Sequence, residues 1–324
     1  MPRLADTVTC QARFERTWGH LTRPHVRALA WLLDAPGLLD PSASRWNGKI
    51  ARDLALAPDV AAWLDALEHD PGPLDAALGM RRHTRLGLYA EALMACHFER
   101  RGTLVAHGLQ VRVDKADTVG EFDFLLRHGP ALLHLELATK FYLLLEDAAS
   151  VDPGAGGELD CLVGANLSDS LGAKMRKIIE RQLSLGSHPA AQRLLDRPVA
   201  AAQALVKGWL FYPQGVVRPM AGISAAHCHG FWCALNETLD LTLDRFVVLA
   251  RLQWLAPLKI DAGAEVLSRP ALHEKLSALF NATATPMPVL VASVRQDGAW
   301  LLEQDRGFIV PPGWRARAAE RMKC

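Results

Sequence analysis

Cysteine is scarce and scattered in this sequence, and none of its six cysteines (10, 96, 161, 228, 233 and 324) forms a Cys-x-x-Cys pair. This spacing excludes a dense disulfide framework and is typical of reduced thiols in a cytosolic protein. Residues 1–6 begin no apolar signal core, and no uncharged apolar stretch is long enough to cross a bilayer. We therefore expect a cytoplasmic protein without a membrane partner.

An excess of one charge is also missing, because 36 Lys and Arg residues face 35 Asp and Glu residues, for a formal net charge of +1. Such a chain has no global electrostatic attraction for nucleic acid, so any contact of that kind has to come from a local basic patch. The sequence has no G-x-S-x-G, Walker or Rossmann glycine pattern, which argues against a nucleophile elbow and against nucleotide-loop enzymes. Half of the residues are hydrophobic, enough for a sizeable core in one large or two modest domains.

The sequence does contain an acidic motif on two short stretches of alternating apolar residues. Glu121 and Asp123 alternate with phenylalanines, and Glu136 alternates with leucines. Side chains of a β-strand switch faces at every residue, so this pattern predicts a hairpin over residues 119–145 with its acids on one face. Lys140 follows Glu136 by four residues and therefore shares that face.

A turn at His128 and Gly129 would place Glu121 opposite Glu136, with Asp123 diagonal to it. Like charges in that arrangement are destabilising unless something neutralises them. Mg²⁺ or Mn²⁺ would do so, because both prefer carboxylate oxygen. The hairpin therefore predicts a divalent-metal cradle, with a lysine that holds the attacking water or stabilises charge on a phosphate. A solvated strand face is the alternative interpretation.

The remaining pattern predicts three segments, namely a helical N-terminal region (1–80), a core (81–213) and a C-terminal α/β extension packed on the core (214–324). Within the core, hydrophobic periodicity predicts the order helix, three strands, helix, strand. The expected ranges are a helix at 84–101, a strand at 103–113, the hairpin, a helix from Ser168 or Asp169 to about 185, and a strand at 205–212. In the extension we expect a helix at 269–280 and a strand at 300–310, with further apolar runs at 245–255 and 289–294.

An α-β-β-β-α-β core with acids on its second and third strands resembles the PD-(D/E)XK nuclease superfamily. Residues 120–124 (Gly-Glu-Phe-Asp-Phe) and 134–142 (His-Leu-Glu-Leu-Ala-Thr-Lys-Phe-Tyr) carry this resemblance. More narrowly, the chain resembles a bacterial family called domain of unknown function 1853, through residues 29–33, 136–142, 208–213, 229–232 and 253–257. The superfamily resemblance implies an α/β fold with a restriction-endonuclease-like core and a mixed sheet.

The same resemblance implies roles for individual residues. Asp123 and Glu136 would be metal ligands for Mg²⁺ or Mn²⁺, Lys140 the catalytic lysine, and Glu91 on the first core helix an auxiliary acid. Glu121 is an extra acid that either joins the metal site or is solvated. The superfamily usually has one residue between the acid and the lysine, whereas this chain has three, which moves the lysine about 7 Å along the strand.

Two further groups of residues are candidates for binding. Lys174, Arg181 and Gln182 lie on the helix after the hairpin, where they would contact phosphates of a nucleic acid, although a solvated helix face explains them about as well. A cluster of His and Cys residues looks like a metal site at first sight (His227, Cys228, His229 and Cys233). Adjacent ligands of this kind rarely give tetrahedral zinc geometry, so we interpret the cluster as buried small polar residues.

Two functions follow from these observations. The first is a metal-dependent nuclease acting on DNA, in which the acidic cluster binds the metal that activates a water. The second is a catalytically inactive nuclease-fold protein that binds nucleic acid or a protein partner. The displaced lysine and the near-zero net charge favour the second. The two functions differ in whether the acidic cluster binds Mg²⁺ or Mn²⁺.

Overall fold

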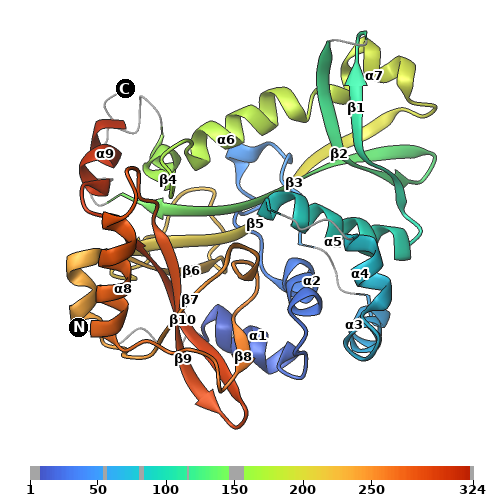
Figure 1. Ribbon diagram of the computed structural model, residues 1–324. Coiled ribbons are helices and arrows are strands. Elements are labelled where there is room, and N and C mark those ends of the chain that lie inside the picture. The colour runs from blue at the N-terminus through green and yellow to red at the C-terminus, as the bar shows by residue number, and fades with distance from the viewer. Residues whose placement is uncertain (1–7, 54–56, 80–83, 115–116, 146–156, 322–324) are drawn as a thin grey trace.

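The computed structural model describes residues 8–53, 57–79, 84–114, 117–145 and 157–321. In these ranges ten strands form one mixed sheet, and helices pack on both of its faces (Figure 1). None of the described helices is both long and apolar enough to cross a membrane.

The bounds of the regular elements follow the predicted pattern closely. The α-helices of the described residues are α1 (Cys10–Trp18), α2 (Pro24–Asp34), α3 (Asp59–His69), α4 (Gly72–Leu78), α5 (Leu86–Arg100), α6 (Leu171–Lys177), α7 (Pro189–Leu194), α8 (Arg269–Asn281) and α9 (Trp314–Arg321). The strands are β1 (Leu104–Arg112), β2 (Thr118–His128), β3 (Ala131–Leu144), β4 (Leu162–Gly164), β5 (Val199–Pro213), β6 (Cys228–Ala234), β7 (Phe246–Val248), β8 (Lys259–Asp261), β9 (Val289–Asp297) and β10 (Trp300–Val310). The helix predicted at 84–101 and the strand predicted at 300–310 are both confirmed.

The sheet has the strand order β1-β2-β3-β5-β6-β10-β9-β7, with β4 paired to β3 and β8 paired to β10. The pairs β1–β2 and β2–β3 are antiparallel, whereas the pairs β3–β5, β5–β6 and β6–β10 are parallel. Strand β10 is antiparallel to β9. The elements predicted as helix, three strands, helix and strand are present as α5, β1, β2, β3, α6 and β5, with the unpredicted β4 before α6 and α7 after it. The mixed sheet expected for the α/β fold is therefore confirmed.

The two faces of β3 pack against different helices. Leu135 and Leu137 face the largest core, where α5 contributes the fully buried Leu93 and Met94. On the other face Ala138 packs in a core with Met175 of α6. Each fully buried side chain of this size contributes roughly 2 kcal/mol by leaving water. The alternation predicted for β3 therefore places two helices on opposite sides of one strand.

Residues from all three predicted segments share one hydrophobic core. The largest core joins helices α1 to α5 to residues of β5, β9 and β10. The sheet also continues across residue 213, because β5 pairs with β6 and β6 pairs with β10. The N-terminal helices therefore pack on strands that lie more than half the chain away.

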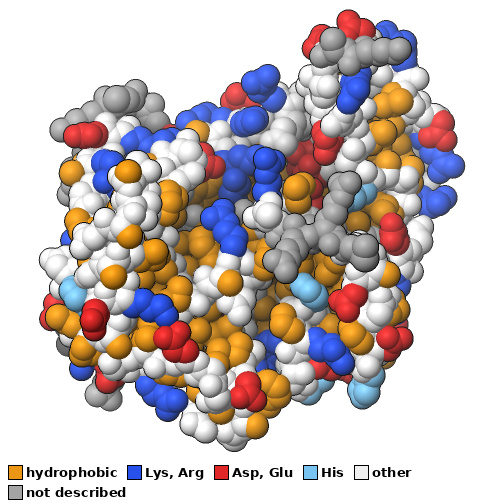
Figure 2. Space-filling model, in the orientation of Figure 1, with side chains coloured by type: hydrophobic (Ala, Val, Ile, Leu, Met, Phe, Trp, Pro, Cys, Tyr) orange, Lys and Arg blue, Asp and Glu red, His pale blue; other side chains and the backbone are white. Residues whose placement is uncertain are grey.

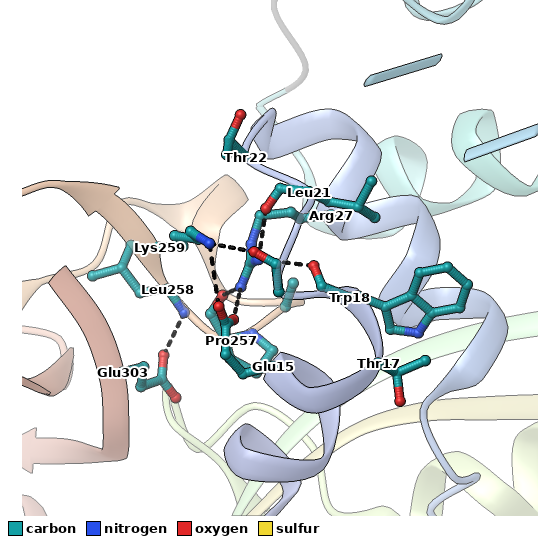
Figure 3. A network of polar contacts seen from close by, with 12 residues as sticks. Glu15, Thr17, Trp18, Leu21, Thr22, Arg27, Pro257, Leu258, Lys259 and Glu303 are labelled. Carbon is teal, nitrogen blue, oxygen red and sulfur yellow. Dashed lines mark hydrogen bonds and ion pairs between the residues drawn. The ribbon is translucent and has the colours of Figure 1, made fainter. Parts of the chain in front are cut away.

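A polar network links these N-terminal helices to the C-terminal strands (Figure 3). The buried Arg27 of α2 donates to the carbonyls of Leu21 (2.9 Å) and Pro257 (3.0 Å) and pairs with Glu15 (3.2 Å). Lys259 also pairs with Glu15, at 3.2 Å. A buried charge is tolerated when it is paired and hydrogen-bonded, so this network holds α1 and α2 against the strand that contains Lys259.

The hairpin formed by β2 and β3 has a different register from the predicted one. His128 pairs with Ala131, so Gly129 (φ 58°) and Pro130 form the turn. Proline has no N–H to donate to a ladder, which explains its place in the turn and not in the strand. The prediction that Glu121 lies opposite Glu136 is therefore wrong. The shift of two residues brings Asp123 level with Glu136.

Replacing Gly208 of β5 by alanine should destabilise the sheet. Gly208 pairs with Lys140 of β3 and has φ of 151°, and an added Cβ would lie 1.8 Å from the Lys140 carbonyl oxygen. We expect Gly208→Ala to lower the free energy of unfolding by about 3 kcal/mol or more, measured by urea unfolding. Gly298→Ala is the control, because its φ is also positive but no heavy atom lies within 4 Å of the added Cβ, and it should cost about 1 kcal/mol. Equal midpoints for the two variants would contradict the close approach of β3 and β5.

Candidate functional site

The candidate site begins where β2 separates from β3. The backbone ladder between the two strands ends at Phe124 and Leu135. Beyond it, the Leu137 N–H donates to Asp123 Oδ2 at 2.9 Å. A side-chain oxygen thus takes the place of a backbone acceptor, and the Asp123 carboxyl is fixed against the edge of β3.

The strand β2 also changes face at Asp123. Phe122 and Phe124 would share a face in a regular strand, but they pack in different cores, the first with Leu132 and the second with Leu135. In β1 the partners of these phenylalanines are Leu109 and His107, so the residue between them, Gly108 (φ 62°), lies level with Asp123. The acid therefore sits at a local irregularity of the sheet and not on a smooth strand face.

Glu136 of β3 is buried and both of its oxygens have partners. Its side chain is 1 % exposed, and Oε1 lies 2.6 Å from Nε2 of the fully buried His134. Nδ1 of this histidine has no hydrogen-bond partner among the described residues, which favours the tautomer that donates from Nε2. The Gln182 amide nitrogen donates to Glu136 Oε2.

Gln182 reaches the site because α6 ends in a π-helical turn at Ile178–Gln182. Such turns are rare and often occur at functional sites. The N-terminus of α6 is capped by Ser170, whose hydroxyl accepts from the Ala173 N–H at 3.1 Å. The predicted cap at Ser168 or Asp169 is therefore wrong by one or two residues, and Asp169 is left to make other contacts.

Burial and neighbouring carboxylates raise the proton affinity of two acids of this site, Asp123 and Glu91. Burial, followed by the charges of Glu136 and Glu91, raises the pKa of Asp123 from 3.8 to about 8. Burial also raises the pKa of Glu91 on α5, with further contributions from Glu121 and Glu136. The structure thus brings together the predicted acids Glu91, Asp123 and Glu136. Glu121 is exposed at the edge of the group, where it accepts from Gln110 at 3.3 Å.

Lys174 of α6 is the cation most closely connected to these acids. Its ammonium donates to the Gln182 amide oxygen at 3.3 Å, and the amide nitrogen of the same residue contacts Glu136. Burial and the neighbouring Lys140 and Lys177 lower the pKa of Lys174, against the opposite effect of Glu136 and Asp123. Lys174 was predicted only as a contact for nucleic acid.

Lys140 has a different partner from the predicted one. Its ammonium lies 3.5 Å from Asp169 Oδ2, and the Tyr142 hydroxyl donates to the same oxygen at 3.0 Å. The Lys140 side chain is 23 % exposed, so it remains at the surface beside the acids. Figure 2 shows the resulting surface, where Lys and Arg side chains gather next to Asp and Glu side chains in a hollow beside the lobe of β1, β2 and α7.

The acids match a divalent cation in chemistry but do not form a ready-made ligand set. In the described part of the chain, no three His, Cys, Asp or Glu side chains are grouped so that they could hold a metal ion. Carboxylates that are crowded together in a partly buried place nevertheless suit a hard divalent cation, which takes oxygen ligands and neutralises their charge. Glu91, Asp123 and Glu136 are the residues that would hold it, after Glu136 releases one of its present partners.

The other predicted residues fall outside this group. Arg181 is exposed, and its predicted contact with nucleic acid stays a prediction. His227 lies between the Tyr212 hydroxyl (2.9 Å) and the Ser224 carbonyl (2.6 Å), while Cys228 and Cys233 are buried. These contacts agree with the interpretation of His227, Cys228 and Cys233 as buried polar residues of the core, whereas His229 is exposed and the interpretation is wrong for that residue.

Sequence reasoning missed His134 and Asp169 as members of the site. The signal for His134 was its spacing, because a residue two positions from Glu136 shares its strand face. Asp169 carried no signal beyond its position before a helix. Its contact with Lys140 arises from the loop between β4 and α6, which the sequence pattern does not place.

The raised pKa of Asp123 predicts a pH-dependent stability in the metal-free protein. Between about pH 4 and 8 the folded state holds a proton on Asp123 that the unfolded chain releases, so the free energy of unfolding falls as the pH rises through that range. Asp123→Asn keeps an oxygen for the Leu137 N–H and should unfold with a shallower pH dependence.

The measurement is urea unfolding in EDTA at pH 5 to 9, with Glu274→Gln, an exposed position on α8, as the control. Parallel pH profiles for Asp123→Asn and the wild type would show that the carboxyl ionises normally.

Comparison with known proteins gives one family. Residues 27–310 match the family model described as Domain of unknown function (DUF1853). No curated protein and no solved structure matches the chain. The matched residues run from α2 to the end of β10 and include every residue of the candidate site. They cover most of the sequence, so the chain belongs to the family defined by Domain of unknown function (DUF1853).

Proposed function

We propose that this protein is a metal-dependent phosphodiesterase that hydrolyses DNA on a PD-(D/E)XK nuclease-like core. The observation that carries the proposal is the meeting of three carboxyls, from α5, β2 and β3, with the ammonium groups of Lys140 and Lys174. Acids whose pKa is raised by burial and by neighbouring carboxylates, next to lysines, are the arrangement expected at a site for a cation and a phosphate.

The topology supports the placement in the nuclease superfamily. The core elements follow one another as α5, β1, β2, β3, α6 and β5. The first three strands are antiparallel, and β5 returns parallel to β3 after α6. Glu91, Asp123 and Glu136 lie on the first helix, second strand and third strand of this order, which are the positions implied by the resemblance.

The chain's own residues have distinct roles in this proposal. Bound Mg²⁺ or Mn²⁺ would neutralise the acids and make water a better nucleophile. His134 and Gln182 orient Glu136, and the Leu137 N–H orients Asp123. Lys174, held by Gln182, stabilises the negative charge that develops on the scissile phosphate.

Lys140 has a secondary role because Asp169 competes for its ammonium group. Lys140 lies close enough to Lys174 for its charge to lower the pKa of Lys174. A phosphodiester backbone between them would relieve this repulsion, and Arg181 on the exposed face of the same helical segment would contact a neighbouring phosphate. Lys140 therefore binds substrate, and its loss weakens cleavage less than the loss of Lys174.

The alternative is a catalytically inactive nuclease-fold protein that binds nucleic acid or a protein partner. Two observations favour it. Both oxygens of Glu136 are already hydrogen-bonded, and Lys140 is paired with Asp169. In such a protein Gln182 and Lys174 would replace a metal as the partners of the acids.

Calorimetric titration with Mn²⁺ separates the two functions. We expect metal-free wild-type protein to bind Mn²⁺ and Asp123→Ala to lose that binding, because the variant removes a carboxylate ligand. Glu274→Gln is the control, since it removes one exposed carboxylate elsewhere. Binding that survives in Asp123→Ala would place the metal at another site, and no binding to the wild type would favour the inactive protein.

Cleavage of DNA should depend more strongly on Lys174 than on Lys140. With Mn²⁺ present, we expect Lys174→Met to lower the cleavage rate about 100-fold, as for loss of a group that stabilises charge in the transition state. Lys140→Met should lower it about 10-fold, as for loss of one phosphate contact. The exposed Lys177 of the same helix supplies the control variant Lys177→Met, which should change the rate less than about twofold.

The cleavage assay uses both supercoiled plasmid and single-stranded DNA as substrates, because the sequence does not specify whether the DNA is double-stranded or single-stranded. A larger loss of cleavage rate in Lys140→Met than in Lys174→Met would assign the catalytic role to Lys140. Mn²⁺ binding without cleavage of any substrate would support the inactive alternative.

A further inference from the structure

Two cysteines from distant parts of the chain contact each other on the side of the sheet that carries α1. Cys10 is the first residue of α1 and is partly exposed, whereas Cys228 is the first residue of β6 and is buried. Their side chains lie close enough for each thiol to shift the pKa of the other. Contact between two thiols is the first requirement for a disulfide, because a bridge needs close Cβ atoms.

The surroundings of Cys10 favour its thiolate. The Arg13 guanidinium lies 3.7 Å from Cys10 Sγ, and Cys10 is the first residue of a nine-residue helix, where the helix dipole favours negative charge. The hydrogen bond from Cys228, followed by the positive charges of Arg13 and Arg306, lowers the pKa of Cys10. Burial instead raises the pKa of Cys228. One partner is therefore ready to react and the other stays a neutral thiol.

The remaining cysteines of the described residues lack this environment. Cys96 is partly exposed, but burial and Glu99 raise its pKa. Cys161 and Cys233 are buried, and burial raises the pKa of each. Reactivity toward oxidants follows thiolate character and exposure, and Cys10 combines the two.

We propose that Cys10 and Cys228 are a reversible oxidation site that forms a disulfide when the protein meets a hydroperoxide. The Cys10 thiolate attacks one oxygen of hydrogen peroxide, the O–O bond breaks, hydroxide leaves, and Cys10 becomes a sulfenic acid. Cys228 then attacks that sulfur, the S–O bond breaks, and water leaves as the S–S bond forms. Two thiols lose two electrons, the peroxide becomes two waters, and a dithiol reductant reverses the reaction.

The bridge would act on the N-terminal packing and does not depend on the proposed nuclease activity. It joins α1 to β6, and α1 also supplies Gln11, which donates to the buried Glu303, and Glu15, which pairs with Arg27 and Lys259. A covalent link at the first residue of α1 therefore fixes the same helix that the polar network of Figure 3 holds.

The test is peptide mapping after oxidation. Full-length protein carrying Cys324→Ser, to remove the C-terminal thiol, is treated with one equivalent of hydrogen peroxide, alkylated and digested without reduction. We expect a linked pair of peptides containing residues 10 and 228 that is two hydrogens lighter than the separate peptides and is split by dithiothreitol. Before oxidation, iodoacetamide should modify Cys10 about tenfold faster than Cys96 at neutral pH.

Variants assign the order of the steps. Cys228→Ala should stop at the sulfenic acid, detected as a dimedone adduct on Cys10, and Cys10→Ser should leave Cys228 unmodified. Cys96→Ser is the matched control and should keep the bridge. Peptide mapping of the protein that keeps both Cys10 and Cys228 tests the proposal even where a variant does not fold. Two outcomes would overturn the proposal. In the first, Cys96 is oxidised while residues 10 and 228 stay unmodified. In the second, Cys10 carries a dimedone adduct and no bridge forms although Cys228 is present.

Discussion

The hydrogen bond from the Leu137 N–H to the Asp123 carboxyl is the interaction on which the candidate site depends. It ends the ladder between β2 and β3 at Phe124 and Leu135 and still holds the two strands together. A backbone donor at this depth needs an acceptor, and a side chain supplies it. The two strands thereby separate without leaving an unsatisfied amide. The opening gives Glu136, on the opposite face of β3 from Leu137, room for the helical segment that carries Gln182.

Buried charges elsewhere in the molecule are closely matched, which makes the crowded acids informative. Arg306 donates to both oxygens of Glu303 at 2.7 Å, and Lys207 pairs with Asp53 at 2.9 Å. At the candidate site, by contrast, burial and neighbouring carboxylates raise the pKa of Asp123 and of Glu91 although Lys174 lies nearby. Burying like charges together is costly in folding free energy. The crowded acids therefore carry a cost that function explains better than stability does.

Strong local patterns in the sequence predicted the elements that form the site. The apolar spacing of α5 and the alternation of β3 were sufficient because both elements bury one face or two opposite faces in a regular way. The hairpin register was wrong by two residues because a single sequence does not decide whether Gly129 ends or begins the turn. Pro130 explains the observed register, because proline has no N–H to donate to the ladder and is therefore placed in the turn.

The sequence could not predict contacts made by residues distant along the chain. Asp169 meets Lys140 through a loop, and Gln182 reaches Glu136 only because a π-helical turn follows α6. The same limit hid the contact between Cys10 and Cys228, which are separated by most of the chain and come together through the packing of α1 on the sheet. Periodicity reports which face a residue occupies, whereas these pairs depend on how the elements are placed.

The geometry of β3 explains why the strand lysine is the weaker candidate for chemistry. Four residues of a strand span about 13 Å, so the backbones of Glu136 and Lys140 lie far apart on one face. The backbone of Lys140 cannot move closer, because its carbonyl lies against Gly208 of β5. Its ammonium therefore meets Asp169, the acid that the next loop provides. Lys174 starts from a helix that crosses the same face, so its side chain approaches Glu136 from above the sheet and reaches it through Gln182. A lysine on α6 can thus occupy the place beside the acids that the longer spacing on β3 leaves empty.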